Sequence, residues 1–147
     1  MLGAGGAARA VVHALGEAGA TEIVVVNRTP ARAEAAAAVA RGVARVGAAD
    51  DARDADLVVN ATPVGMDGHS VAIDARHLRA GQLVVDLVYQ PAATPLMEAA
   101  HAAGATAVNG LGMLVHQAGH QLRTWTGQAP PLEVMAAAAR AALSQNG

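Results

Sequence analysis

The sequence of 147 residues has the length of one domain with one hydrophobic core. Hydrophobic residues make up 53% of it and charged residues 15%, which excludes a disordered chain because enough apolar surface is available for burial. The net charge of -2 excludes general attraction to nucleic acids or anionic membranes, and the absence of Lys and Cys excludes Schiff-base lysines and thiolate chemistry. No apolar run reaches the ~18 residues of a membrane span and no signal peptide pattern is present, so we expect a cytoplasmic protein.

Short β-branched runs alternate with longer Ala-rich stretches along the chain. We expect strands at residues 22–26, 57–60, 83–87 and 106–108, with a weaker candidate at 44–46. We expect helices at residues 7–18, 30–40, 94–103, 111–124 and 132–143. Gly19, Gly42 and Gly104 each follow such a helix, where a left-handed residue is typical. This alternation predicts one α/β domain over residues 1–147, a Rossmann-type three-layer α/β/α fold with a mostly parallel sheet.

The beginning of the chain is short for this fold, because only Met1 and Leu2 precede the first glycine. A Rossmann sheet has a central strand before its glycine-rich loop, so the sequence predicts a truncated first strand. We expect either that an upstream segment is missing or that another segment fills this place. An unfilled place in the sheet would expose unpaired backbone groups, which makes a homodimer a candidate.

A glycine-rich loop lies between this strand and the first helix, formed by Gly3, Ala4, Gly5, Gly6 and Ala7. Gly3 allows a tight turn, and Gly5 lets the backbone approach a pyrophosphate. The free N–H groups and the dipole of the following helix favour an anion. A plain strand–helix turn is the alternative. The amphipathic helix and the strand that follow complete a βαβ unit, which favours a dinucleotide site.

The end of the second strand indicates which dinucleotide is bound. NAD-binding domains usually have an acidic residue there for the ribose hydroxyls, whereas this sequence has Asn27, Arg28, Thr29 and Arg32. Two guanidinium groups and a helix N-terminus suit a 2′-phosphate. Solvated arginines at a helix start are the alternative. The sequence therefore predicts NADP as the cofactor.

Other polar clusters carry weaker indications. His116 and His120 lie four residues apart on a helix, but the glutamate of a zinc protease is absent, so we expect no metal site. An acidic cluster predicts a solvated loop or a short helix: Asp50, Asp51, Asp54 and Asp56, with Arg53. Asp86 is catalytic by position or orders the following loop through backbone N–H groups, and we favour the second interpretation.

Further motifs follow the glycine-rich loop in a fixed order. They read Asn-Arg-Thr-x-x-Arg, Asn-Ala-Thr-Pro-x-Gly-Met, Asp-Leu-Val-Tyr-x-Pro-x-x-Thr-Pro-Leu, Gly-x-x-Met-Leu-Val-x-Gln-Ala and Trp-Thr-Gly. With Gly-Ala-Gly-Gly-Ala at the start, they span nearly the whole chain and resemble the shikimate dehydrogenase family. The resemblance implies an oxidoreductase that reduces 3-dehydroshikimate to shikimate with NADPH, in the chorismate pathway of aromatic amino-acid biosynthesis.

The resemblance also implies roles for single residues. The glycine-rich loop would bind the pyrophosphate, and the second-strand tip would bind the 2′-phosphate. The cofactor would also be contacted by Thr62, Leu87, Gly110 and Met113. Tyr89 and Gln117 would reach the substrate. Without the resemblance, Tyr89 is a packing residue and Gln117 a solvated helix residue.

The larger departure of the sequence from that family concerns the catalytic residues. Its enzymes carry an amino-terminal domain with a catalytic Lys and Asp pair, whereas this sequence has no Lys and no such domain. We therefore expect no catalytic residue here, and a chain that binds NADP(H) but is inactive alone. The alternatives are a non-catalytic NADP(H)-binding module and a quinate or aminoshikimate dehydrogenase.

Overall fold

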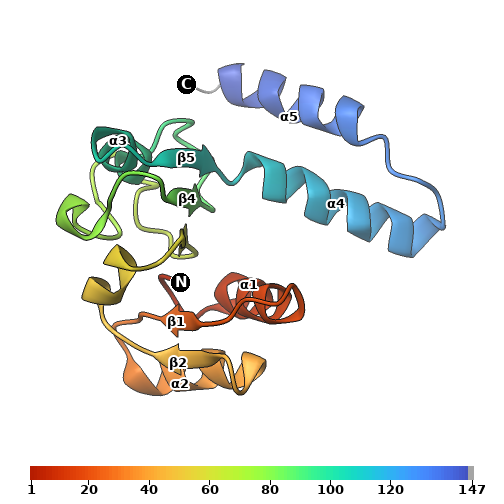
Figure 1. The fold of residues 1–147 in the computed structure, drawn as a ribbon. Helices are drawn as coiled ribbons and strands as arrows, with labels where there is room; N and C mark the ends of the chain where they lie inside the picture. Colours follow the sequence, from red (N-terminus) through yellow and green to blue (C-terminus); the bar gives the residue numbers. More distant parts are fainter. Residues whose placement is uncertain (146–147) are drawn as a thin grey trace.

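The computed structural model describes residues 1–145, which form a parallel sheet with helices on both faces (Figure 1). The strands are β1 (Ile23–Val25), β2 (Ala44–Val46), β3 (Leu57–Asn60), β4 (Leu83–Asp86) and β5 (Thr106–Asn109). The α-helices are α1 (Gly6–Glu17), α2 (Pro30–Ala37), α3 (Pro95–Ala102), α4 (Leu111–Thr126) and α5 (Leu132–Gln145). Three short 3-10 turns are η1 (Ala38–Ala40), η2 (Ala49–Arg53) and η3 (Ala75–His77).

The residues at the beginning of the chain occupy the centre of the sheet. β1 pairs with β2 and β3 pairs with β4 and β5, all in parallel. Leu2 forms parallel bridges to Val26 and Asn60, and its N–H donates to the Val59 carbonyl at 2.8 Å. The spatial order is therefore β2, β1, the segment around Leu2, β3, β4 and β5. This confirms the predicted parallel α/β fold and its short first strand.

Small side chains let the helices lie close to this sheet. One buried cluster joins β3 and β4 to α3 and contains Val58, Val84 and Leu96. A second cluster joins β1 to α1 and α2 and consists of Val12, Ile23, Val25, Ala33, Ala36 and Ala37. Alanines on the inner face of α2 bury little area each but permit close packing without aromatic residues.

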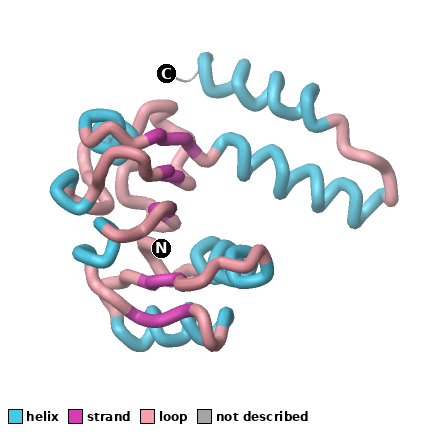
Figure 2. Tube along the Cα trace, in the orientation of Figure 1, coloured by secondary structure: helices cyan, strands magenta, loops and turns pink. Residues whose placement is uncertain are grey.

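The predicted elements are found with small shifts of their ends. The weak candidate at 44–46 is β2, and the helix expected at 30–40 is α2 continued by η1. Gly19, Gly42 and Gly104 all have positive φ, as expected. The acidic cluster lies in and just after η2, a short helix. α4 and α5 form a hairpin that extends away from the sheet (Figures 1 and 2).

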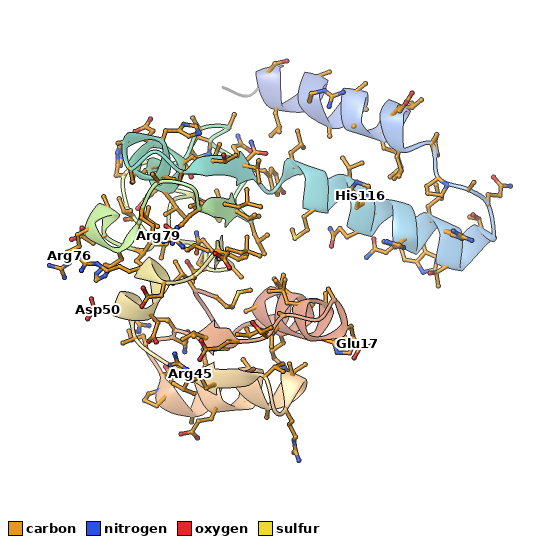
Figure 3. All side chains as sticks on the ribbon, in the orientation of Figure 1. Glu17, Arg45, Asp50, Arg76, Arg79 and His116 are labelled. Atoms are coloured by element: carbon orange, nitrogen blue, oxygen red, sulfur yellow. The ribbon has the colours of Figure 1, made fainter. Side chains whose placement is uncertain are left out.

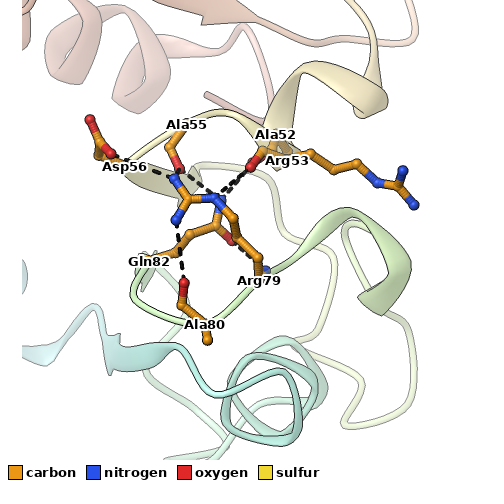
Figure 4. A network of polar contacts seen from close by, with 7 residues as sticks. All are labelled: Ala52, Arg53, Ala55, Asp56, Arg79, Ala80 and Gln82. Atoms are coloured by element: carbon orange, nitrogen blue, oxygen red, sulfur yellow. Dashed lines mark hydrogen bonds and ion pairs between the residues drawn. The ribbon is translucent and has the colours of Figure 1, made fainter.

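A polar network attaches η2 to the start of β4 (Figure 4). Gln82 is only 1% exposed, and its side chain donates to the carbonyls of Ala52 and Ala55, each at 2.7 Å. Its amide oxygen accepts the backbone N–H of Arg79 at 2.8 Å, and the Arg79 guanidinium donates to the Arg53 carbonyl at 2.7 Å. The connection before β3 is thereby fixed against β4.

Candidate functional site

A cleft of about 280 Å³ opens at the carboxyl ends of β3 and β4, where ligands bind in open α/β sheets. The start of α1, the loops after β3 and β4, and the first turn of α4 form its walls. The lining residues are Ala7, Ala61, Thr62, Met66, Leu87, Val88, Tyr89, Gln90 and Met113. The structure thus brings together several residues that the motifs singled out, from four distant parts of the sequence.

The glycines of the loop before α1 differ in their surroundings. Gly3 has a φ of +100°, and a Cβ there would lie 2.9 Å from Thr62 Cγ2 and 3.1 Å from the Ala61 carbonyl oxygen. A Cβ at Gly5 or Gly6 would meet no protein atom within 4 Å. Gly3 is therefore required by packing, whereas Gly5 and Gly6 border open space.

This open space lies at the N-terminus of α1. Gly5 is the N-cap and makes no side-chain hydrogen bond, and the first turn contains no acidic residue. The first N–H groups of the helix consequently lack a side-chain acceptor and carry the positive end of the helix dipole. The residues present fit the pyrophosphate of a dinucleotide, which carries negative charge and approaches the backbone closely.

The tip that follows β1 is exposed and rich in positive charge. Asn27 donates from Nδ2 to the Thr29 carbonyl at 3.0 Å and so shapes the turn into α2. Thr29 is the N-cap of α2 without a side-chain capping bond. Arg28 and Arg32 are exposed and make no ion pair with any residue between 1 and 145.

Arg45 on β2 (Figure 3), in contrast to Arg28 and Arg32, forms ion pairs with acidic side chains. It bonds Glu22 at 2.7 Å and Asp51 at 2.6 Å. The bond to Arg45 holds the pKa of Asp51 below its usual value, so this charge is neutralised within the fold. The guanidinium groups of Arg28 and Arg32 remain available for an external anion such as a 2′-phosphate.

A buried polar cluster, formed by Asn60, Asp86 and Thr94, lies behind the cleft. All three residues are fully buried. Asn60 Nδ2 and Thr94 Oγ1 donate to the two oxygens of Asp86, at 2.9 and 2.6 Å. The N–H of Val88 also donates to Asp86, at 3.1 Å. The expectation that Asp86 orders the loop after β4 through a backbone N–H is confirmed.

Sequence reasoning missed the other two members of this cluster. Asn60 ends β3, and Thr94 is the N-cap of α3 before a proline, so each had a local explanation. The parallel register that places Asn60 opposite Asp86 brings them together. A polar residue at the end of each of two neighbouring buried strands was the available indication.

Gly110 acts in the fold through close packing. A Cβ at this position would lie 2.0 Å from the Leu87 carbonyl oxygen. Its N–H donates to the Val88 carbonyl at 3.1 Å. This approach of α4 to the loop after β4 brings Met113 to the cleft.

The remaining candidates lie on the outer part of α4. Gln117 is exposed, one turn beyond Met113, and does not line the cleft. His116 instead lines a larger, mostly apolar cleft of about 860 Å³ between the end of the sheet and the α4–α5 hairpin (Figure 3). That larger cleft is not lined by the glycine-rich loop, whereas the smaller one is lined by Ala7 of that loop. The smaller cleft is therefore the candidate site.

Two kinds of feature are missing from the described part of the chain, residues 1–145. It contains no group of three or more acidic, His or Cys side chains that could hold a metal ion. It also contains no helix that is both long and apolar enough to cross a membrane.

The chain matches two family models. Residues 110–140 match the Shikimate 5'-dehydrogenase C-terminal domain. Residues 1–90, more than half of the chain, match the family described as NADP oxidoreductase, coenzyme F420-dependent.

Curated relatives identify the family more closely than the two models do. The Shikimate dehydrogenase (NADP(+)) of Methanocella arvoryzae is 43% identical over 150 residues, which cover 97% of this chain and 55% of the relative. The Shikimate dehydrogenase (NADP(+)) of Methanopyrus kandleri is 47% identical over 148 residues, covering 92% of this chain and 51% of the relative. The chain belongs to the shikimate dehydrogenase family. It spans about half the length of these relatives.

Solved structures agree with this membership in an oxidoreductase family. Shikimate 5-dehydrogenase from Thermus thermophilus, in complex with NADP(H) and shikimate, superposes with a TM-score of 0.89 at 44% identity. The match covers 97% of this chain and 54% of that one. Quinate dehydrogenase from Corynebacterium glutamicum, in complex with NAD, gives a TM-score of 0.83 at 36% identity, covering 92% of this chain and 51% of that one. This chain thus has the fold of the corresponding part of the shikimate dehydrogenase structures.

Proposed function

We propose that this chain binds NADP(H) and is the cofactor-binding part of a shikimate dehydrogenase, which reduces 3-dehydroshikimate to shikimate. The single observation that carries the proposal is the exposed pair Arg28 and Arg32, without acidic partners, at the tip after β1. Bound NADPH would supply the hydride for the ketone of the substrate. The residues of this chain would hold and orient it.

The adenosine half would lie over the first turns of α1 and α2. Backbone N–H groups next to Gly5 and Gly6 face open space and would donate to the pyrophosphate oxygens. Arg28 and Arg32 would bind the 2′-phosphate with planar donor groups, and the free hydroxyl of Thr29 would add a further donor. Ala4 and Asn27 would shape the backbone on either side.

The nicotinamide half would enter the cleft behind Ala7. Leu87 and Met113 would cover the ring and exclude water, and Gly110 would keep α4 close enough for this contact. The Thr62 hydroxyl donates to Asn60 Oδ1 at 2.6 Å, so we propose that it meets the cofactor as an acceptor.

The substrate side of the site is sparse in this chain. The Tyr89 hydroxyl at the cleft and the Gln117 amide farther along α4 are the groups we propose for contact with the substrate hydroxyls. The sequence contains no Lys, and we propose that the catalytic Lys and Asp pair belongs to an amino-terminal domain that this chain does not supply. We also propose a cytoplasmic location.

The homodimer expected from an unfilled place in the sheet loses that basis in the structure. The peptide groups around Leu2 already bond to β1 and β3, so the sheet needs no second copy at that level. Light scattering coupled to size-exclusion chromatography would measure the assembly.

The similarity to quinate dehydrogenase makes quinate an alternative substrate. The solved quinate dehydrogenase holds NAD, however, and the arginine tip of this chain favours a 2′-phosphate. A cofactor-binding module without any catalytic partner is the other alternative.

Calorimetry and a turnover assay test the proposal together. We expect NADPH to bind the purified chain, and we expect no NADP+-dependent oxidation of shikimate by the chain alone, because general acid–base help contributes roughly 10²–10⁴-fold in rate. Absence of NADPH binding would overturn the cofactor assignment. Measurable turnover by the chain alone would overturn the assignment of the catalytic pair to another domain.

A further inference from the structure

Asp86 is a buried carboxylate for which the proposed reaction has no use. It is fully buried, and no Arg, His or chain amino group within residues 1–145 forms an ion pair with it. Burying a carboxylate is costly unless hydrogen bonds replace its hydration. Three donors do so here, from Asn60, Thr94 and the Val88 backbone. Such a group directly behind a cleft calls for an explanation beyond packing.

The hydrogen bonds of Asp86 reach both walls of the cleft. Through Asn60 it reaches the loop after β3, because Asn60 Nδ2 also donates to the Val64 carbonyl at 3.1 Å and Asn60 Oδ1 accepts from Thr62 N and Oγ1 at 3.0 and 2.6 Å. Through Val88 and Thr94 it fixes the loop after β4 and the start of α3. One carboxylate therefore sets the separation of the two loops.

The chemistry of Asp86 also selects one orientation of Asn60. A carboxylate only accepts hydrogen bonds, so the NH₂ of Asn60 must face it and the Asn60 oxygen must face Thr62. An amide in place of Asp86 could keep its oxygen toward Asn60 and Val88, but its NH₂ would then face Thr94 Oγ1, whose hydroxyl would have to accept instead of donate. The position thus favours an acceptor-only side chain, because Thr94 Oγ1 already accepts from Met97 N.

We propose that Asp86 is a positioning residue that holds the nicotinamide half of the cofactor site in shape through Asn60 and Thr94. The inference rests on the proposed function. The adenosine half would be bound by other elements, the first turns of α1 and α2, with which Asp86 has no hydrogen bond or ion pair in residues 1–145. Loss of the cluster must then weaken binding of the whole cofactor but not of its adenosine half.

The test compares NADPH with 2′,5′-ADP, which contains the adenosine half only. We expect Asp86→Asn and Thr94→Val each to raise the ratio of the dissociation constants, NADPH over 2′,5′-ADP, about fivefold or more, the effect of losing one good hydrogen bond. Thr94→Ser keeps the hydroxyl and should restore the original ratio. Thr94→Val is the milder change and decides the outcome if Asp86→Asn does not fold.

Gln82→Leu provides the matched control. Gln82 is as deeply buried and as fully bonded as the cluster but lies at the opposite end of β4. We expect this variant to lower stability while leaving the ratio unchanged. Equal weakening of both ligands by Thr94→Val, or no weakening, would overturn the positioning role alone. Failure of the unmodified chain to bind either ligand would overturn the proposed function and the inference with it.

Discussion

Single residues of one sequence motif have different physical roles in this structure. Gly3 is fixed by its φ of +100° and by the Thr62 methyl and the Ala61 carbonyl, which a Cβ would approach to 2.9 and 3.1 Å, whereas Gly5 and Gly6 border open space. The motif itself predicts a dinucleotide loop but does not separate these roles. The difference matters because a substitution at Gly5 or Gly6 can change cofactor binding without changing the fold.

Gly5→Ala should weaken NADPH binding without loss of stability. The added methyl group meets no protein atom within 4 Å, but it enters the space where we place the pyrophosphate. We expect affinity, measured by calorimetry, to fall roughly tenfold or more. Gly112→Ala, also in open space, is the control and should leave affinity unchanged. Wild-type affinity in the Gly5 variant would show that the loop does not approach the cofactor.

Gly110→Ala should destabilise the fold. Its Cβ would lie 2.0 Å from the Leu87 carbonyl oxygen, which is backbone and cannot move aside as a side chain does. Overpacking of this kind costs about 1–3 kcal/mol. Urea unfolding followed by circular dichroism should show the loss, and an unchanged midpoint would mean that α4 shifts without cost.

At the level of elements, local patterns were sufficient for most of the fold. Within residues 1–145, the β-branched runs predicted all five strands and the longer helical stretches predicted all five α-helices, since both periodicities are local. Contacts between segments far apart in the sequence could not be predicted from such local patterns. The meeting of Asn60 with Asp86 depends on parallel register, and that of Gln82 with Ala52 depends on how η2 turns.

Gln82→Leu should lower the free energy of unfolding by roughly 2–4 kcal/mol, because the buried carbonyl of Ala52 and the part-buried backbone groups of Ala55 and Arg79 lose their partner. Urea titration measures the loss, and calorimetry should show unchanged NADPH affinity. A change below about 0.5 kcal/mol, the range of ordinary surface substitutions, would mean that water replaces the amide.

At the scale of the whole molecule, the residues to which we assign cofactor binding gather at one edge of the sheet, and few groups remain for contact with a substrate. The residues that line the cleft fall between positions 7 and 113 of the sequence. The α4–α5 hairpin extends away from the sheet (Figure 1). The predicted cofactor residues largely meet around one edge of the sheet, whereas Gln117 lies apart. Sequence reasoning could propose a cofactor site because the motifs that predict it are local. The substrate could not be read from residues alone, since few groups in this chain are available to contact it.

The affinity of the chain for NADPH and NADH, before and after Arg28→Ala, tests the central claim most directly. We expect NADPH to bind more tightly, and the substitution to weaken NADPH roughly 10- to 100-fold while leaving NADH unchanged, since only NADPH has the 2′-phosphate. Arg41→Ala, the same change of charge in the turn that precedes β2, is the control and should alter neither affinity. Equal affinities for the two cofactors, or equal losses in the Arg28 variant, would contradict the account.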